Sequence, residues 1–255
     1  MANADTVLQA LVEMSRRLGQ PERDLVILGE GNTSALCDDG TFWVKASGTE
    51  MRTIDADGFV RMRVDAVRAL VERETLTDDA FREALAEARV DPSSKRRPSV
   101  ETVLHAIALS EGGAKFVGHT HPVAVNALTC SAAISEAALG RLFPDEIVVC
   151  GPAPAYVPYT DPGLPLARSV RERIRRYAAE WGAPPKVILL QNHGLIALGT
   201  TPAEVDNITA MYVKTCRVLA GTYAFGGPHF LSAEAVRRID TRPDEAYRRR
   251  QLNLE

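Results

Sequence analysis

Hydrophobic residues along this chain change repeatedly between helical and strand spacing. Helical spacing over 6–19, 67–71, 81–88, 99–109, 131–142, 166–181 and 201–221, with a further helix opening at Pro122, predicts amphipathic helices. Short apolar runs at 25–28, 42–46, 59–64, 115–121, 147–150, 187–190 and 194–199 predict strands. Because no stretch of linker composition interrupts this alternation, we expect one α/β domain over residues 1–255.

The overall composition is that of an ordinary soluble globular protein, with 45% hydrophobic and 25% charged residues. A formal charge of −3 provides no general attraction to nucleic acid or to anionic membranes, so we expect neither as a partner. The four cysteines are far apart and form no C-x-x-C pair, which favours reduced thiols and a cytoplasmic location. No apolar run approaches the roughly 20 residues that a membrane span needs.

The most informative polar motif is Gly118-His119-Thr120-His121-Pro122, at the end of a predicted buried strand. Residues two apart in a strand point to the same face, so His119 and His121 are expected to bring their imidazoles together. Two neutral imidazoles so placed are half of a divalent metal site. The alternative is that both are ordinary core histidines with satisfied hydrogen bonds.

A third ligand is expected from His193, which lies in the turn Gln191-Asn192-His193-Gly194 after the apolar run at 187–190. Three protein ligands with an open position for water or substrate are typical of catalytic zinc. The chain has five histidines, and the remaining two are His105 and His229.

Two glycine-bearing loops are candidates for holding an anion. The first is Gly29-Glu30-Gly31-Asn32-Thr33-Ser34 and the second is Ser47-Gly48-Thr49. Both follow predicted neighbouring strands, and we expect them at the same edge of the sheet, where backbone N–H groups can approach a ligand. The first loop does not match the dinucleotide-binding fingerprint. A tight turn between strands is the competing interpretation.

The helix that precedes the histidine strand opens with Pro98-Ser99-Val100-Glu101, with Ser99 as the expected N-cap. Glu101 and His105 are four residues apart and share a helix face, next to the positive end of the helix dipole. This places a carboxylate beside the predicted metal pair, although a plain surface pair explains the spacing as well. His105 is expected to orient a neighbour or to fill the core.

These motifs resemble, in their order, the class II aldolase/adducin family, which includes fuculose- and rhamnulose-phosphate aldolases. The matching blocks are Gly-Glu-Gly-Asn-Thr-Ser, Lys-Ala-Ser-Gly, Pro-Ser-Val-Glu-x-x-x-His, Gly-His-Thr-His-Pro and Asn-His-Gly-Leu-Ile-Ala, from Gly29 to about Gly199. The resemblance implies a three-layer α/β/α domain with a central, largely antiparallel sheet. It also implies a homotetramer with active sites between subunits.

By position, the resemblance assigns a metal site, a catalytic acid/base and a phosphate site. His119, His121 and His193 match zinc ligands, with Mn²⁺ as another possible ion, and Glu101 matches the acid/base. Asn32, Ser47, Gly48 and Ser99 match positions that hold the substrate phosphate. The epimerase branch of the family carries aspartate where Glu101 stands, so the glutamate favours carbon–carbon bond chemistry.

The implied reaction is retro-aldol cleavage of a ketose phosphate through an enediolate, which gives dihydroxyacetone phosphate and a short aldehyde. A divalent ion can stabilise the enediolate as a Lewis acid, and Glu101 can exchange the proton on carbon. The same chemistry serves a decarboxylase or dehydratase of a related phosphate, which is the first alternative. A non-catalytic binding protein that retains a metal is the second.

Two departures from the family pattern limit the assignment. Fuculose-phosphate aldolase has a second serine where this chain has Val100. The tyrosine that donates a proton to the aldehyde oxygen has no match, because Phe143-Pro144-Asp145 precedes Ile147. The candidates for this acid are Tyr156, Tyr159, Tyr212 and Tyr223.

Overall fold

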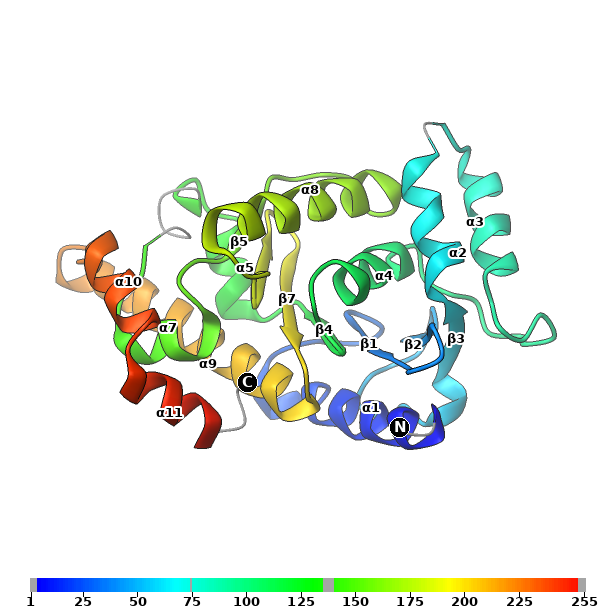
Figure 1. The fold of residues 1–255 in the computed structure, drawn as a ribbon, viewed down its shortest axis with the longest axis horizontal. Helices are drawn as coiled ribbons and strands as arrows, with labels where there is room; N and C mark the ends of the chain where they lie inside the picture. Colours follow the sequence, from blue (N-terminus) through cyan, green and yellow to red (C-terminus); the bar gives the residue numbers. More distant parts are fainter. Residues whose placement is uncertain (1–3, 74, 135–139, 252–255) are drawn as a thin grey trace.

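A central seven-stranded sheet organises the computed structural model, which describes residues 4–73, 75–134 and 140–251 (Figure 1). The strand order is β3-β2-β1-β4-β7-β6-β5, and every neighbouring pair is antiparallel except β5 and β6. The strands are β1 (Asn32–Leu36), β2 (Thr41–Lys45), β3 (Phe59–Arg63), β4 (Phe116–Thr120), β5 (Ala155–Val157), β6 (Val187–Leu190) and β7 (Gly194–Gly199).

Helices cover both faces of this sheet, which confirms the three-layer α/β/α architecture. One face carries α1 (Ala4–Leu18), α5 (Val123–Thr129) and α9 (Pro202–Thr222), and the other carries α2 (Val64–Arg68), α4 (Thr102–Ser110) and α8 (Leu164–Trp181). The other α-helices of the described residues are α3 (Asp78–Glu87), α7 (Pro144–Cys150), α10 (Ala233–Asp240) and α11 (Pro243–Gln251). No helix of the described residues has both the length and the apolar character to cross a membrane.

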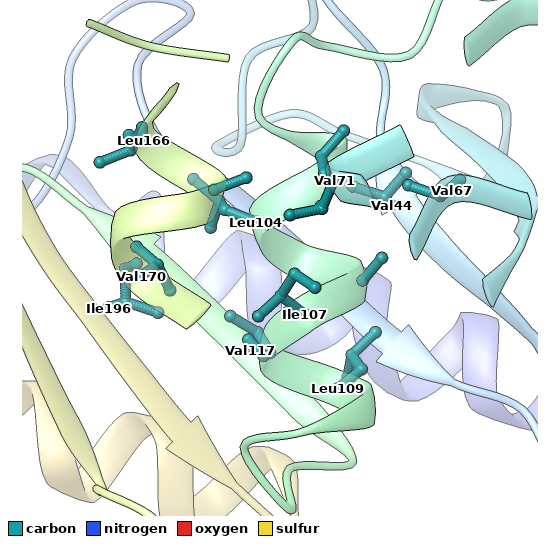
Figure 2. Packing of buried hydrophobic residues seen from close by; sticks show 14 of the residues in the cluster. Val44, Val67, Val71, Leu104, Ile107, Leu109, Val117, Leu166, Val170 and Ile196 are labelled. Atoms are coloured by element: carbon teal, nitrogen blue, oxygen red, sulfur yellow. The ribbon is translucent and has the colours of Figure 1, made fainter. Parts of the chain in front are cut away.

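The protein has two apolar cores, one on each side of the sheet. The larger one packs α4 and α8 against the strands, and Figure 2 shows Leu104 and Ile107 of α4 gathered with Val117 of β4 and with Leu166 and Val170 of α8. The α4 helix is buried along nearly its whole circumference, from Thr102 to Leu109. A helix apolar on all sides has to lie inside the protein, so α4 is held in place from both sides.

The predicted strand at 25–28 is wrong, because these residues form a loop. Leu25 is buried, but Ile27 and Leu28 are 66% and 78% exposed, and Leu28 has a positive φ of 52°. The Leu25 carbonyl accepts the N–H of His121 at 2.9 Å. This contact fixes the loop against the end of β4, and β1 begins only at Asn32.

The predicted strand at 147–150 is also wrong, since these residues belong to α7. Pro144 at the first helical turn and the acidic Asp145 and Glu146 are helix-start signals that outweigh the β-branched apolar run. Downstream, Ala155–Val157 forms β5 although the apolar runs predict no strand between 150 and 187. The predicted helix at 131–142 falls partly on residues 135–139, outside the described residues.

Candidate metal and active site

The pairing of β4 with β7 brings three histidines to one end of the sheet. His119 lies in β4 opposite Ile196, and Thr120 lies opposite Leu195, so the β6–β7 turn that carries His193 sits beside the end of β4. His121 follows β4 directly. Strand alternation puts His119 and His121 on one side, as their spacing predicts.

The nitrogens of these histidines converge. His119 Nε2 lies 3.0 Å from His121 Nε2 and 3.2 Å from His193 Nε2, and the ligand atoms of the three lie within 4.8 Å of one another. His119 Nδ1 lies 3.0 Å from the carbonyl oxygen of Leu195, to which it donates. The lone pair of its Nε2 therefore faces the other two rings.

The electrostatics of the cluster suit metal ligation. Burial lowers the pKa of His119 and of His121 to about 4, so both imidazoles are neutral at physiological pH. Neutral imidazole is the form that binds a metal ion. Three nitrogen lone pairs facing one point repel one another unless a cation lies between them, so the donor set fits one divalent ion of the zinc type.

Glu101 faces this cluster from the start of α4, where it is the residue before the first helical turn. Its Oε1 lies 3.2 Å from His193 Nε2 and 3.7 Å from His119 Nε2, and its Oε2 accepts a 2.5 Å hydrogen bond from Asn32 Nδ2. Burial raises the pKa of this carboxyl, but the facing imidazoles and the Asn32 amide together bring it below its usual range. The ionised carboxylate is the form that can accept a proton.

A pocket of about 220 Å³ adjoins Glu101, His121 and His193. All four residues that the sequence proposed for an anion, namely Asn32, Ser47, Gly48 and Ser99, line it. Ser99 is not the helix cap itself, but its Oγ accepts the N–H of Glu101 at 3.0 Å. At Gly31, which has a φ of 64°, an added Cβ would lie 2.6 Å from the His119 carbonyl oxygen. This glycine lets the first loop approach the histidine cluster.

The sequence interpretation missed Lys45, which lines the same pocket and is only 3% exposed. Its Nζ donates to the Gly29 carbonyl oxygen at 3.1 Å and thereby ties the two loops together. Burial lowers the pKa of this ammonium. The available signal was a lysine at the end of the apolar run Phe42-Trp43-Val44, because a cation buried there needs a partner or a ligand.

No tyrosine lines this pocket among the described residues. Tyr212 is buried, which raises its pKa well above its usual value, and the exposed Tyr159 donates to Asp161 at 3.1 Å. Tyr223 is 58% exposed and lines a separate groove between α5 and α9. The acid that would serve an aldehyde oxygen is therefore not assigned within this chain.

Comparison with curated proteins gives two relatives. An uncharacterized oxidoreductase, YuxG, from Bacillus subtilis is 30% identical over 205 residues, which cover 76% of this chain and 27% of that protein. A probable bifunctional methylthioribose-1-phosphate isomerase/methylthioribulose-1-phosphate dehydratase from Nocardia farcinica is 27% identical over 158 residues, or 60% of this chain and 28% of that protein. The chain thus spans about a quarter of the length of the curated relatives it matches.

Solved structures and a family model agree on the fold. The N-terminal class II aldolase domain of a conserved protein from Thermoplasma acidophilum matches with a TM-score of 0.69 and 29% identity, over 86% of this chain and 96% of that one. An L-fuculose 1-phosphate aldolase matches with a TM-score of 0.70 and 20% identity, over 94% and 96%. The model for the class II aldolase and adducin N-terminal domain matches residues 9–220. The chain therefore belongs to the class II aldolase and adducin family.

Proposed function

We propose that this chain is a metal-dependent aldehyde-lyase that cleaves a ketose phosphate to dihydroxyacetone phosphate and a short aldehyde. The observation that carries the proposal is the position of Glu101, whose carboxylate faces the three histidines beside a pocket lined by anion-binding groups. A base, a metal site and an anion site within one small pocket are the parts that retro-aldol chemistry requires.

His119, His121 and His193 would hold one divalent ion, with zinc or manganese as the candidates. When bound, the ion supplies Lewis acidity that polarises the carbonyl and the adjacent hydroxyl oxygen of a ketose. The Leu195 carbonyl holds the His119 ring in the orientation that this requires. The neutral state of His119 and His121 keeps their nitrogens available above about pH 5, one unit above their pKa of about 4.

Glu101 would move the proton at the substrate carbon next to the carbonyl. In the cleavage direction it returns a proton to the carbon that loses its bond to the aldehyde fragment. In the synthetic direction it removes that proton. The Asn32 N–H holds Oε2 of Glu101, which leaves Oε1 directed at the histidine cluster, where the reacting carbon would lie.

The substrate phosphate would be bound by Asn32, Ser47, Gly48 and Ser99, with Lys45 as the nearby cation. Backbone and hydroxyl donors on two glycine-bearing loops suit an anion, and the positive end of α4 adds to the attraction. The likeness to an L-fuculose 1-phosphate aldolase supports a phosphorylated ketose as the substrate class.

Dehydration of a ketose phosphate is a second candidate function, favoured by the relative named as a methylthioribulose-1-phosphate dehydratase. In dehydration, Glu101 would remove a proton from the carbon next to the carbonyl, which is also its step in the synthetic direction of the aldolase reaction. The two reactions differ in the bond that breaks, which is carbon–carbon in aldol cleavage and carbon–oxygen in dehydration. Product analysis separates them.

We also propose a homotetramer in which a neighbouring subunit completes the active site. The absence of a tyrosine from the pocket lining among the described residues supports this, because the aldehyde oxygen needs an acid. Exposed Ile27 and Val123 line a pocket with His121, and together with the exposed Leu28 they offer apolar surface for a subunit contact. Sedimentation equilibrium tests the assembly, and a monomer at micromolar concentration would contradict it.

A turnover screen tests the function. Dihydroxyacetone phosphate, dihydroxyacetone and pyruvate are offered as donors with a panel of short aldehydes, and keto-acid and ketose phosphates are assayed for carbon dioxide or water loss. We expect condensation with dihydroxyacetone phosphate to be much faster than with either unphosphorylated donor. Dehydration without condensation would select the second candidate, and no turnover with metal bound would indicate a non-catalytic binding protein.

A further inference from the structure

A network of hydrogen-bonded side chains connects the core between β1 and α4 to Glu101. Ser34 Oγ lies 2.6 Å from His105 Nδ1, and His105 Nε2 contacts Asn32 Oδ1. Asn32 Nδ2 then donates to Glu101 Oε2 at 2.5 Å. Ser34 and His105 are completely buried, and Asn32 is 6% exposed. The network is therefore shielded from water up to the point where it reaches the pocket.

The periodicity of β1 and α4 places the side chains of this network next to one another. Asn32 and Ser34 are two apart in β1 and face α4, whereas Thr33 faces α1, where its hydroxyl lies 2.6 Å from that of Ser15. His105, one turn after Glu101 in α4, reaches both β1 side chains. The His105 imidazole thus contacts two side chains on the same face of β1, one with each ring nitrogen.

The network permits only one direction of its hydrogen bonds, from Ser34 toward Glu101. The ionised Glu101 can only accept, so the Asn32 amide turns its nitrogen to Glu101 and its oxygen to His105. His105 Nε2 must then carry the hydrogen, and Nδ1 accepts from the Ser34 hydroxyl. Burial lowers the pKa of His105 to about 4, against the opposing effect of nearby Glu101, which agrees with a neutral ring that carries one hydrogen.

We propose that His105 is a positioning residue that fixes the amide of Asn32, with its N–H groups toward Glu101 and the pocket and its oxygen toward α4. This inference rests on the proposed function, because it explains how Asn32 serves the base and the anion at once. A flipped amide would present oxygen to the Glu101 carboxylate and to an incoming phosphate, and both contacts would be repulsive.

The test measures binding of inorganic phosphate to the metal-loaded protein by calorimetry, in the wild type and in His105→Leu, His105→Gln, Asn32→Ala and His105→Leu/Asn32→Ala. Leucine fills space without donating, whereas the glutamine amide can donate to Asn32 Oδ1. We expect His105→Leu to weaken phosphate binding by roughly tenfold or more, the scale of one lost hydrogen bond to a charged group. His105→Gln should restore most of the affinity.

The double variant separates positioning from packing. Once Asn32 is absent, His105 has no amide to orient, so His105→Leu should cause no further loss of phosphate affinity in the Asn32→Ala background. A purely structural histidine would give equal losses in both backgrounds, and that result would overturn the inference. A wild-type protein that does not bind phosphate would overturn it as well.

Ser34→Ala covers the case in which His105→Leu does not yield folded protein. Loss of the Ser34 donor frees His105 to adopt the other tautomer, so a smaller loss of phosphate affinity in the same direction is expected. Unchanged affinity in Ser34→Ala would then contradict the inference. Turnover of the wild type is scored separately, so phosphate binding without any lyase activity would count against the proposed function alone.

Discussion

His119 Nδ1 lies 3.0 Å from the carbonyl oxygen of Leu195, a residue directly after the turn that carries His193. The β7 strand thus supplies the contact that orients a proposed metal ligand in β4. Since β4 and β7 are paired, any shift of the β6–β7 turn would move His193 and the hydrogen-bond partner of His119 together. The two proposed ligands are coupled through the sheet, which favours a site that is formed before a metal ion binds.

We predict that His121→Ala loses about one bound divalent ion per chain, because two imidazoles retain little affinity for zinc. His121 is a suitable proposed ligand to replace, because it follows β4 and is half-buried, whereas His119 is fully buried. Metal analysis of protein purified without added zinc measures the change. His229→Ala, at an exposed histidine, is the control and should keep its metal. Equal metal content in both variants would contradict the assignment.

Lys45→Met is predicted to raise the KM for a phosphorylated donor by roughly tenfold or more, since one charge-assisted contact is removed. The KM for unphosphorylated dihydroxyacetone should change little. Steady-state kinetics with both donors give the ratio, and Lys115→Met at an exposed lysine serves as the control. Parallel changes for both donors would show that Lys45 acts through the structure of the loops.

Much of the architecture follows from local sequence. The Asp39-Gly40 turn gives the β1–β2 hairpin, with Gly40 at a φ of 76°, as Asp-Gly between apolar runs predicts. The gathering of His119 and His121 follows from a period of two residues. Both signals depend only on neighbours in the chain, so they can be recognised without knowing the fold.

Other features depend on tertiary structure. Among the described residues, the 25–28 run pairs with no strand, and the 147–150 run is buried as a helix against α9 and α10. Periodicity cannot separate a short buried strand from a short buried helix. The contacts behind the proposed roles of Lys45 and His105 form only when β1, β2 and α4 come together, because their partners are distant in sequence.

Stability should fall as the pH drops below about 6.5, and His105 should account for part of the loss. Burial lowers its pKa to about 4 in the folded protein, with Glu101 and Lys45 as the facing charges. The unfolded chain, with a pKa near 6.5, then binds more protons between these values, so acid favours unfolding. Urea unfolding at pH 7 and pH 5 should show the wild type losing ~2 kcal/mol more than His105→Gln. Identical losses would contradict this.

The buried pair of Arg141 and Glu146 should be essential for folding stability. Arg141 Nη1 donates to Glu146 Oε1 at 2.9 Å, and both side chains are 1% exposed. Glu146→Ala leaves a buried guanidinium unpaired and should lower the free energy of unfolding by about 3–5 kcal/mol. Glu72→Ala, which removes the exposed partner of Arg171, is the control and should have little effect. Similar losses of unfolding free energy in both variants would contradict the prediction that the buried pair matters more than the exposed one.

The exchange of one carbon-bound proton of dihydroxyacetone phosphate with deuterated water, followed by NMR, tests the central claim most directly. It isolates the step assigned to Glu101 and needs no knowledge of the aldehyde. We predict that the metal-loaded wild type exchanges this proton, and that Glu101→Gln keeps the metal but slows exchange by at least ~100-fold. The absence of exchange in the wild type, or exchange at the wild-type rate in Glu101→Gln, would contradict the account.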